Sequence, residues 1–106
     1  MPDKIKHLLI ELKAGLMEIY GSRLEGLYLY GSYARGDEEP GSDVDVLILL
    51  DRIDHYTLEI DRTSELISNL SLKFGRSISR LFLSENDWKH RDTPFLANAR
   101  EEAIPA

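Results

Sequence analysis

The stretch GSYARGDEEPGSDVDVLILL, residues 31–50, joins a polar segment to an apolar one. It begins with Gly31-Ser32, directly after the short apolar run 26–30. Ten polar or small residues follow, and the stretch ends in an apolar strand that starts with Asp43 and Asp45. This order predicts that the main strand of the fold and the functional site are formed by the same segment, and that the rest of the chain supports them.

Residues 43–50 are the strongest predicted strand. The last five are all apolar, so both faces of the strand should be covered, which is typical of a central strand. Residues 27–30 predict a shorter strand before it, Gly31-Ser32 a tight turn, and residues 33–35 a short helical turn. Residues 36–42 have the composition of a loop.

Amphipathic patterns on both sides of this segment predict helices. Apolar residues recur every three or four positions over residues 2–20 and 55–74, and Gly75 is placed to end the second helix. Residues 77–83 predict a third strand. A capping box that begins at Ser84 predicts a short helix through Trp88, and Thr93-Pro94 starts a last helix.

The predicted order is therefore helix, strand, turn, strand, helix, strand, helix. The helix between the second and third strands predicts that these two strands are parallel, with a right-handed crossover. The fold class that follows is α/β (α+β), with a small mixed sheet. A chain of 106 residues fits one domain, residues 1–106.

Composition excludes several classes of function. The chain has no cysteine, so it has neither disulfides nor thiolate chemistry, and this suits a cytoplasmic protein. Neither a signal peptide nor an apolar run of the roughly 20 residues that span a bilayer is found. The net charge of −6 argues against nucleic acid as the main partner, but a mononucleotide is allowed because Mg²⁺ neutralises phosphate locally.

Asp43 and Asp45 form the candidate metal site. They are two residues apart on a strand, so their side chains point to the same face, with Cα atoms about 6.6 Å apart. Mg²⁺ prefers oxygen ligands and is usually held by one or two carboxylates together with phosphate and water. The pair therefore predicts a site for one Mg²⁺, or for two ions bridged by a substrate.

Gly31 and Ser32 form the candidate phosphate site. Glycine lets the backbone approach a ligand closely, and serine adds a hydroxyl. The N–H groups of the following helical turn favour an anion. A triphosphate on this turn could reach a metal on Asp43 and Asp45, and attack on its α-phosphate would then be assisted by positioning and charge neutralisation.

At these residues the sequence resembles a known family. Gly31-Ser32, ten residues and then Asp43-Val44-Asp45 match the GSx10DxD signature of minimal nucleotidyltransferases, relatives of the DNA polymerase beta superfamily. The triplet Ala34-Arg35-Gly36 also fits the usual wording of that motif. Residues 84–88 and 94–105 resemble the tail of short bacterial and archaeal members, so the resemblance covers most of the chain, although only the first motif is specific.

The resemblance implies a nucleotidyltransferase fold and an enzyme that transfers a nucleotide, expected to be AMP from ATP, to a hydroxyl. It implies Mg²⁺ as cofactor, with Asp43 and Asp45 as catalytic and metal-binding residues, and Gly31, Ser32 and Arg35 as nucleotide-binding residues. Short members are often antitoxins that add AMP to a tyrosine of a partner HEPN toxin, a ribonuclease. The implied partner is such a toxin, and the oligomeric state stays open.

One departure from the family pattern leaves alternatives open. Members commonly carry a third carboxylate on the strand after the helix, but residues 77–83 contain no acid. Either two aspartates suffice, or the protein is an antitoxin that binds nucleotide weakly or without turnover and neutralises its toxin by binding. Transfer to a small molecule such as an aminoglycoside is a third interpretation, which 106 residues disfavour because such enzymes usually carry a further domain.

Other polar and aromatic residues have ordinary explanations. Arg35 could contact phosphate or pair with a nearby acid, and Tyr33 is expected to be a packed or exposed turn residue rather than to stack on a base. His7, His55 and His90 are far apart in the sequence and predict surface or cap roles. Trp88 and Phe95 are expected to be core or interface anchors.

Overall fold

A four-stranded mixed sheet forms the centre of the protein in the computed structural model, which describes residues 1–106. The strand order is β3-β2-β1-β4. β2 pairs with β1 in antiparallel and with β3 in parallel orientation, and β4 pairs with β1 in antiparallel orientation. The strands are β1 (Leu24–Tyr30), β2 (Val44–Leu50), β3 (Ile78–Ser84) and β4 (Ile104–Pro105). The mixed sheet and the parallel pairing of the second and third strands confirm the prediction.

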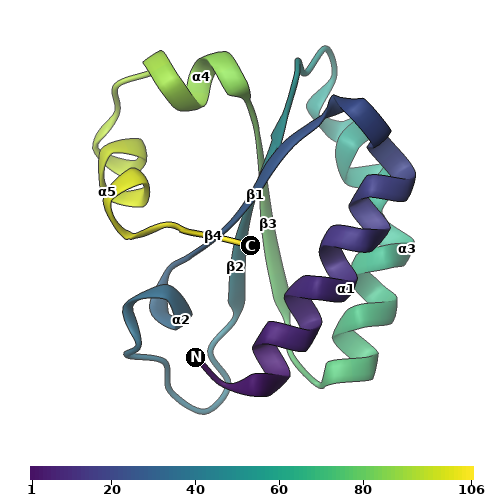
Figure 1. The fold of residues 1–106 in the computed structure, drawn as a ribbon, viewed down its shortest axis with the longest axis vertical. Coiled ribbons are helices and arrows are strands. Elements are labelled where there is room, and N and C mark those ends of the chain that lie inside the picture. Colours follow the sequence, from purple (N-terminus) through teal and green to yellow (C-terminus); the bar gives the residue numbers. More distant parts are fainter.

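Helices lie on both sides of this sheet. Figure 1 shows the two long helices side by side along one face, with α4 and α5 on the other side and α2 at the end of β1. None of the helices is long and apolar enough to cross a membrane. The helices are α1 (Asp3–Tyr20), the 3₁₀ turn η1 (Gly21–Arg23), α2 (Ser32–Arg35), α3 (Tyr56–Phe74), α4 (Glu85–His90) and α5 (Pro94–Glu102).

β2 is the most deeply buried strand. Residues 46–50 are all buried, because β1 and β3 flank the strand and helices cover its faces. The continuous apolar run therefore marks a central strand, as predicted. Only Asp45 interrupts the burial pattern of β2, close to the start of the strand.

The predicted helix ends are confirmed by their caps. The Ser84 hydroxyl accepts a hydrogen bond from Asp87 N at 3.1 Å, and the Thr93 hydroxyl accepts one from Leu96 N at 3.2 Å. Gly75 ends α3 with φ +62°, in the left-handed conformation that favours glycine.

Two details differ from the sequence prediction. β1 begins three residues earlier than expected. The sequence hides this start because the register shifts between Leu24 and Gly26, which disturbs the alternation of side chains. The chain also adds a short fourth strand, β4, after α5. Its two residues are too few to produce a recognisable pattern, and the pairing with β1 is what makes them a strand.

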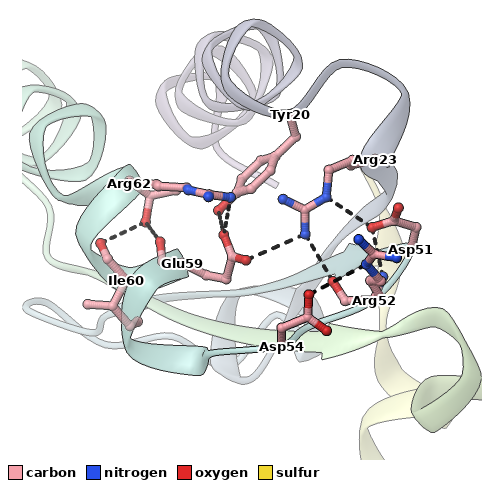
Figure 2. A network of polar contacts seen from close by, with 9 residues as sticks. Tyr20, Arg23, Asp51, Arg52, Asp54, Glu59, Ile60 and Arg62 are labelled. Atoms are coloured by element: carbon pink, nitrogen blue, oxygen red, sulfur yellow. Dashed lines mark hydrogen bonds and ion pairs between the residues drawn. The ribbon is translucent and has the colours of Figure 1, made fainter.

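The core stripe of α3 contains a charged residue. Glu59 is only 3% exposed, whereas Tyr56 at the start of the helix is 41% exposed. The Glu59 carboxylate accepts a hydrogen bond from the Tyr20 hydroxyl at 2.9 Å and lies 3.5 Å from Arg23 and 3.4 Å from Arg62 (Figure 2). This network joins the end of α1 to the start of α3.

Two further contacts extend the network. Arg23 also pairs with Asp51, directly after β2, at 3.1 Å (Figure 2). Burial, followed by the bond to Glu59, raises the pKa of the Tyr20 hydroxyl far above its ordinary value, so Tyr20 remains a hydrogen-bond donor. Buried charge is tolerated here because each group has a partner.

Replacing Glu59 with alanine should destabilise the protein by about 2–3 kcal/mol, because it leaves the buried Tyr20 hydroxyl and two arginines without their shared acceptor. The arginines are partly exposed, so water compensates for some of the loss. Urea unfolding gives the free energy. The matched control is Glu65→Ala, an exposed glutamate on the same helix, which should change it by less than about 0.5 kcal/mol. Equal effects of the two substitutions would contradict this role of Glu59.

Candidate functional site

The predicted site residues meet at the end of the sheet where β1 stops and β2 starts. Because these two strands are antiparallel, the last residue of β1, Tyr30, pairs with Asp45. The turn that begins at Gly31 is thereby brought against the aspartates that lie twelve to fourteen residues later in the chain. The spacing of the motif is thus a consequence of one strand pairing and the loop that connects its two strands.

Gly31 has a conformation and surroundings that only glycine fits. Its φ is +76° and its ψ is −156°, a region that residues with a side chain essentially never occupy. A Cβ built on Gly31 would lie 2.3 Å from Oδ2 of Asp45, well inside contact distance. Because Gly31 has no side chain, the Asp45 carboxylate can occupy the space beside it.

The two aspartates differ in exposure but influence each other. Asp43 is exposed and Asp45 is half-buried. Burial first, and then the nearby charge of Asp43, raise the pKa of Asp45, and Arg35 acts in the opposite direction. A bound cation would stabilise the charged form of such a carboxylate, which is partly buried and lies near a second negative charge.

This donor set fits a divalent cation. Carboxylate oxygens are the ligands that Mg²⁺ prefers, and the Cβ-free space beside Asp45 leaves its carboxylate open to the cleft. No group of three or more acidic or histidine side chains lies close enough together to form a complete metal site. The remaining ligands would then come from a substrate phosphate and water, as is usual for Mg²⁺.

A cleft of about 700 Å³ opens beside these residues. Its lining includes Gly31, Ser32, Arg35 and Asp45 from the predicted site, whereas Asp43 lies outside the lining. The other side of the cleft is formed by α5, which contributes Asn98, Glu101 and Glu102 among others. Four of the five predicted site residues are thus brought together in one cleft, and the fifth acts on it through its charge.

Glu102 is the site residue that sequence reasoning missed. Its Oε1 accepts a hydrogen bond from Gly31 N at 3.0 Å, and its Oε2 lies 3.2 Å from Arg35 Nη1. Its side chain is 24% exposed. It lies 71 residues after Gly31, at the end of the last helix, and nothing local in the sequence indicates that this helix lines the cleft. The only sequence signal was the resemblance of residues 94–105 to the family tail.

Arg35 makes ion pairs within the protein. It lies 3.2 Å from Asp37 and 3.2 Å from Glu102, and its side chain is about half exposed. Arg35 therefore pairs with nearby acids, which is one of its two predicted roles. Its guanidinium also lines the cleft. Ser32 is not a helix cap, since Gly31 occupies that position, and its hydroxyl makes no hydrogen bond within the protein.

The remaining residues have ordinary positions, but Trp88 and Phe95 are not in the core, and Phe95 is 48% exposed. Tyr33 is buried in the core, and its hydroxyl accepts a hydrogen bond from Arg76. All three histidines are exposed and none lines the cleft. Trp88 packs on Tyr28, and Phe95 meets Tyr30 edge to face at 5.8 Å.

β3, the strand on which a third carboxylate is common in the family, places a serine beside Asp45. In the parallel pairing of β2 and β3, the partner of Asp45 is Ser79. A carboxylate on the third strand beside the aspartates is therefore absent from the sheet itself. Glu102 brings a third acid to the cleft from α5, but it faces Gly31 N and Arg35.

A glycine turn packed against an aspartate pair, beside an open cleft, is the kind of site found in metal-dependent enzymes that act on phosphates. Comparison with known proteins is more specific. Residues 9–103 match the family described as "Nucleotidyltransferase domain". The chain belongs to this family and is a nucleotidyltransferase.

Two similar proteins come from Methanocaldococcus jannaschii, and both are named "Putative protein adenylyltransferase". One is 36% identical over 75 residues, which are 71% of this chain and 69% of the relative. The other is 37% identical over 76 residues, which are 72% of this chain and 76% of the relative.

Solved structures share the fold. A structure described as "Crystal structure of the toxin-antitoxin with AMP-PNP" matches with a TM-score of 0.61 and 17% identity, over 89% of this chain and 68% of that one. A mutant of the toxin-antitoxin pair MntA-HpeT matches with a TM-score of 0.62 and 18% identity, over 95% and 70%. At this identity the likeness shows the fold alone, and it confirms the predicted nucleotidyltransferase fold.

Gly31→Ala should destabilise the protein by about 2 kcal/mol or more, because it adds a clash with Asp45 to a backbone conformation that alanine disfavours. Gly36→Ala is the matched control. Gly36 also has a positive φ, +78°, but its ψ of 18° places it in the left-handed region that alanine can adopt at moderate cost, and a Cβ there meets nothing within 4 Å, so it should cost only about 1 kcal/mol. Chemical denaturation measures both values. Equal losses would show that the contact with Asp45 is unimportant.

Asp43→Asn should lower the pKa of Asp45 toward its ordinary value. The charges of Asp43 and Glu102 both raise this pKa, and the substitution removes the charge of Asp43, the larger of the two contributions. Part of the shift remains, since burial is unchanged. In the wild type, the raised pKa means that the contribution of Asp45 to stability falls as pH rises through the interval between its unfolded and folded pKa values. The substitution should narrow that interval.

Carboxyl ¹³C titration by NMR follows Asp45 directly in both proteins. Asp61→Asn, which removes an exposed carboxylate on α3, serves as the control and should leave the Asp45 titration unchanged. An Asp45 pKa that stays the same in Asp43→Asn would contradict the coupling of the two aspartates.

Proposed function

We propose that this chain is a Mg²⁺-dependent nucleotidyltransferase that transfers AMP from ATP to a hydroxyl group of a partner protein. The observation that carries the proposal is the Asp45 carboxylate, seated against the Gly31 turn in an open cleft of a nucleotidyltransferase domain. The names of the two M. jannaschii relatives support protein as the acceptor and adenylyl as the group transferred.

The proposed roles follow from the position of each residue. Asp43 and Asp45 hold the metal, and Ser32, whose hydroxyl has no partner within the protein, binds a phosphate oxygen. Gly31 N and the Arg35 guanidinium are further donors at the cleft. Bound Mg²⁺ supplies neutralisation of the phosphate charge. The protein's own contribution is to fix the turn, the two carboxylates and the triphosphate in one place.

The reaction is a single displacement at phosphorus. The acceptor oxygen forms a bond to the α-phosphorus, and the bond from that phosphorus to the oxygen bridging the α- and β-phosphates breaks. Pyrophosphate leaves with the bonding electrons, and the hydroxyl proton passes to water. The cleft is open to solvent, so the acceptor side chain can be presented by another protein.

The proposed partner is a toxin, and the proposed acceptor is a tyrosine of a HEPN toxin. The fold neighbours that are toxin-antitoxin proteins support this choice, as does the AMP-PNP present in one of them. Acting on a toxin would make the chain an antitoxin. The transfer of AMP would then be the step that silences the partner.

A second candidate is an antitoxin that binds its toxin without transferring a nucleotide. Two observations favour it. β3 has no acid and places Ser79 beside Asp45, and the donors Gly31 N and Arg35 already have a partner in Glu102. Under this candidate, the aspartates could be replaced without loss of toxin neutralisation.

Incubation with α-labelled ATP, Mg²⁺ and the neighbouring gene's product tests both candidates. Label should appear on that protein, and Asp43→Asn and Asp45→Asn should each reduce the rate by about 100-fold or more, because metal-ion stabilisation is lost. Asp61→Asn is the control and should leave the rate unchanged. If both active-site variants neutralise the toxin fully and no label is transferred, the binding candidate is correct instead.

A further inference from the structure

The donors of the proposed phosphate site are already occupied by a carboxylate of the protein itself. One Glu102 oxygen accepts the Gly31 N–H at 3.0 Å, and the other lies 3.2 Å from Arg35 Nη1. A main-chain N–H and a guanidinium are the two kinds of group that proteins use to hold phosphate. The Glu102 carboxylate therefore has the contacts that a phosphate oxygen would take.

Positive charge is scarce in the cleft. Arg35 is the only basic residue among the ten that line it, whereas Asp45, Glu101 and Glu102 are acidic. Gly31 has one N–H, which a carboxylate and a phosphate cannot both use. A cation on Asp43 and Asp45 would reduce the repulsion from those two aspartates, but it would not neutralise Glu102.

The backbone of Glu102 is fixed on both sides. The helix before it is anchored by Leu96 and Ala99, which are buried, and Ala103 N donates to the Ala99 carbonyl at 2.8 Å. The strand after it pairs with β1, where Ile104 is the partner of Leu29. The carboxylate can thus leave Gly31 and Arg35 by rotation of its own side chain, without unfolding α5 or β4.

We infer that the Glu102 carboxylate competes with phosphate for the donors Gly31 N and Arg35, and that a nucleoside triphosphate must displace this carboxylate to bind. The inference rests on the proposed function, because it uses the same turn as the phosphate site. It gives the end of α5 a regulatory role: any contact that draws Glu102 away from the turn increases nucleotide affinity. A partner protein that contacts α5 at the cleft could do so.

Removing the charge of Glu102 should therefore tighten nucleotide binding. Glu102→Gln keeps the size of the side chain but removes the ion pair with Arg35. Its dissociation constant for ATP with Mg²⁺, measured by calorimetry, should fall by about threefold to tenfold, the range expected when a solvent-accessible charge stops competing. Glu101→Gln is the matched control. It removes an exposed charge from the same cleft, but Glu101 makes no hydrogen bond or ion pair, so its effect should be below twofold.

NMR gives the readout that a purely structural role would not change. In the wild type, ATP should shift the Gly31 amide and the Glu102 side-chain carboxyl signal together. If Glu102 instead served only to hold the turn or to bind metal, Glu102→Gln would weaken ATP binding, and that result would overturn the inference.

Two other outcomes separate this inference from the proposed function. If both proteins bind ATP with equal affinity and the Gly31 amide shifts, the phosphate site is correct and the inference about Glu102 alone is wrong. If neither protein binds ATP and the Gly31 amide does not move, these donors are not a phosphate site, and the inference fails together with the proposed function.

Discussion

The contact between the Gly31 turn and the Asp45 carboxylate is the constraint on which the site depends. It requires a glycine with positive φ at the end of β1, an aspartate near the start of β2, and a pairing that places the two side by side. That pairing in turn depends on the burial of β2 between β1 and β3, since a slip of one residue would turn Asp45 toward the core and an apolar neighbour toward the cleft. The same β1–β2 register therefore positions the site residues and buries the apolar side chains of the sheet.

The sequence predicts the parts of the protein that are local or periodic. The apolar run of β2, the helical spacing in α1 and α3, and the caps at Ser84, Thr93 and Gly75 each leave a signal within a few residues. The motif residues 31–45 are also local, because two adjacent strands and one loop bring them together. For these features, the structure that the local sequence favours is the one found in the fold.

Features that depend on tertiary contacts could not be predicted in the same way. Glu59 is in the apolar stripe of α3, where a charged residue argues for exposure, and only the hydroxyl of Tyr20 and two arginines make its burial tolerable. Glu102 reaches Gly31 across 71 residues because α5 packs over the end of the sheet. β4 exists only because β1 offers it a free edge. Each of these is decided by a neighbour that the local sequence does not contain.

The buried network around Glu59 and the cleft around Asp45 lie at opposite ends of the same strand. Glu59 is tied to the residues that follow β2, whereas Asp45 lies near its start, and the seven residues of β2 separate the two by roughly 20 Å. Effects of substitutions at sites this far apart are usually additive. Substitutions that reshape the cleft should therefore leave the network, and with it the stability of the domain, largely unchanged.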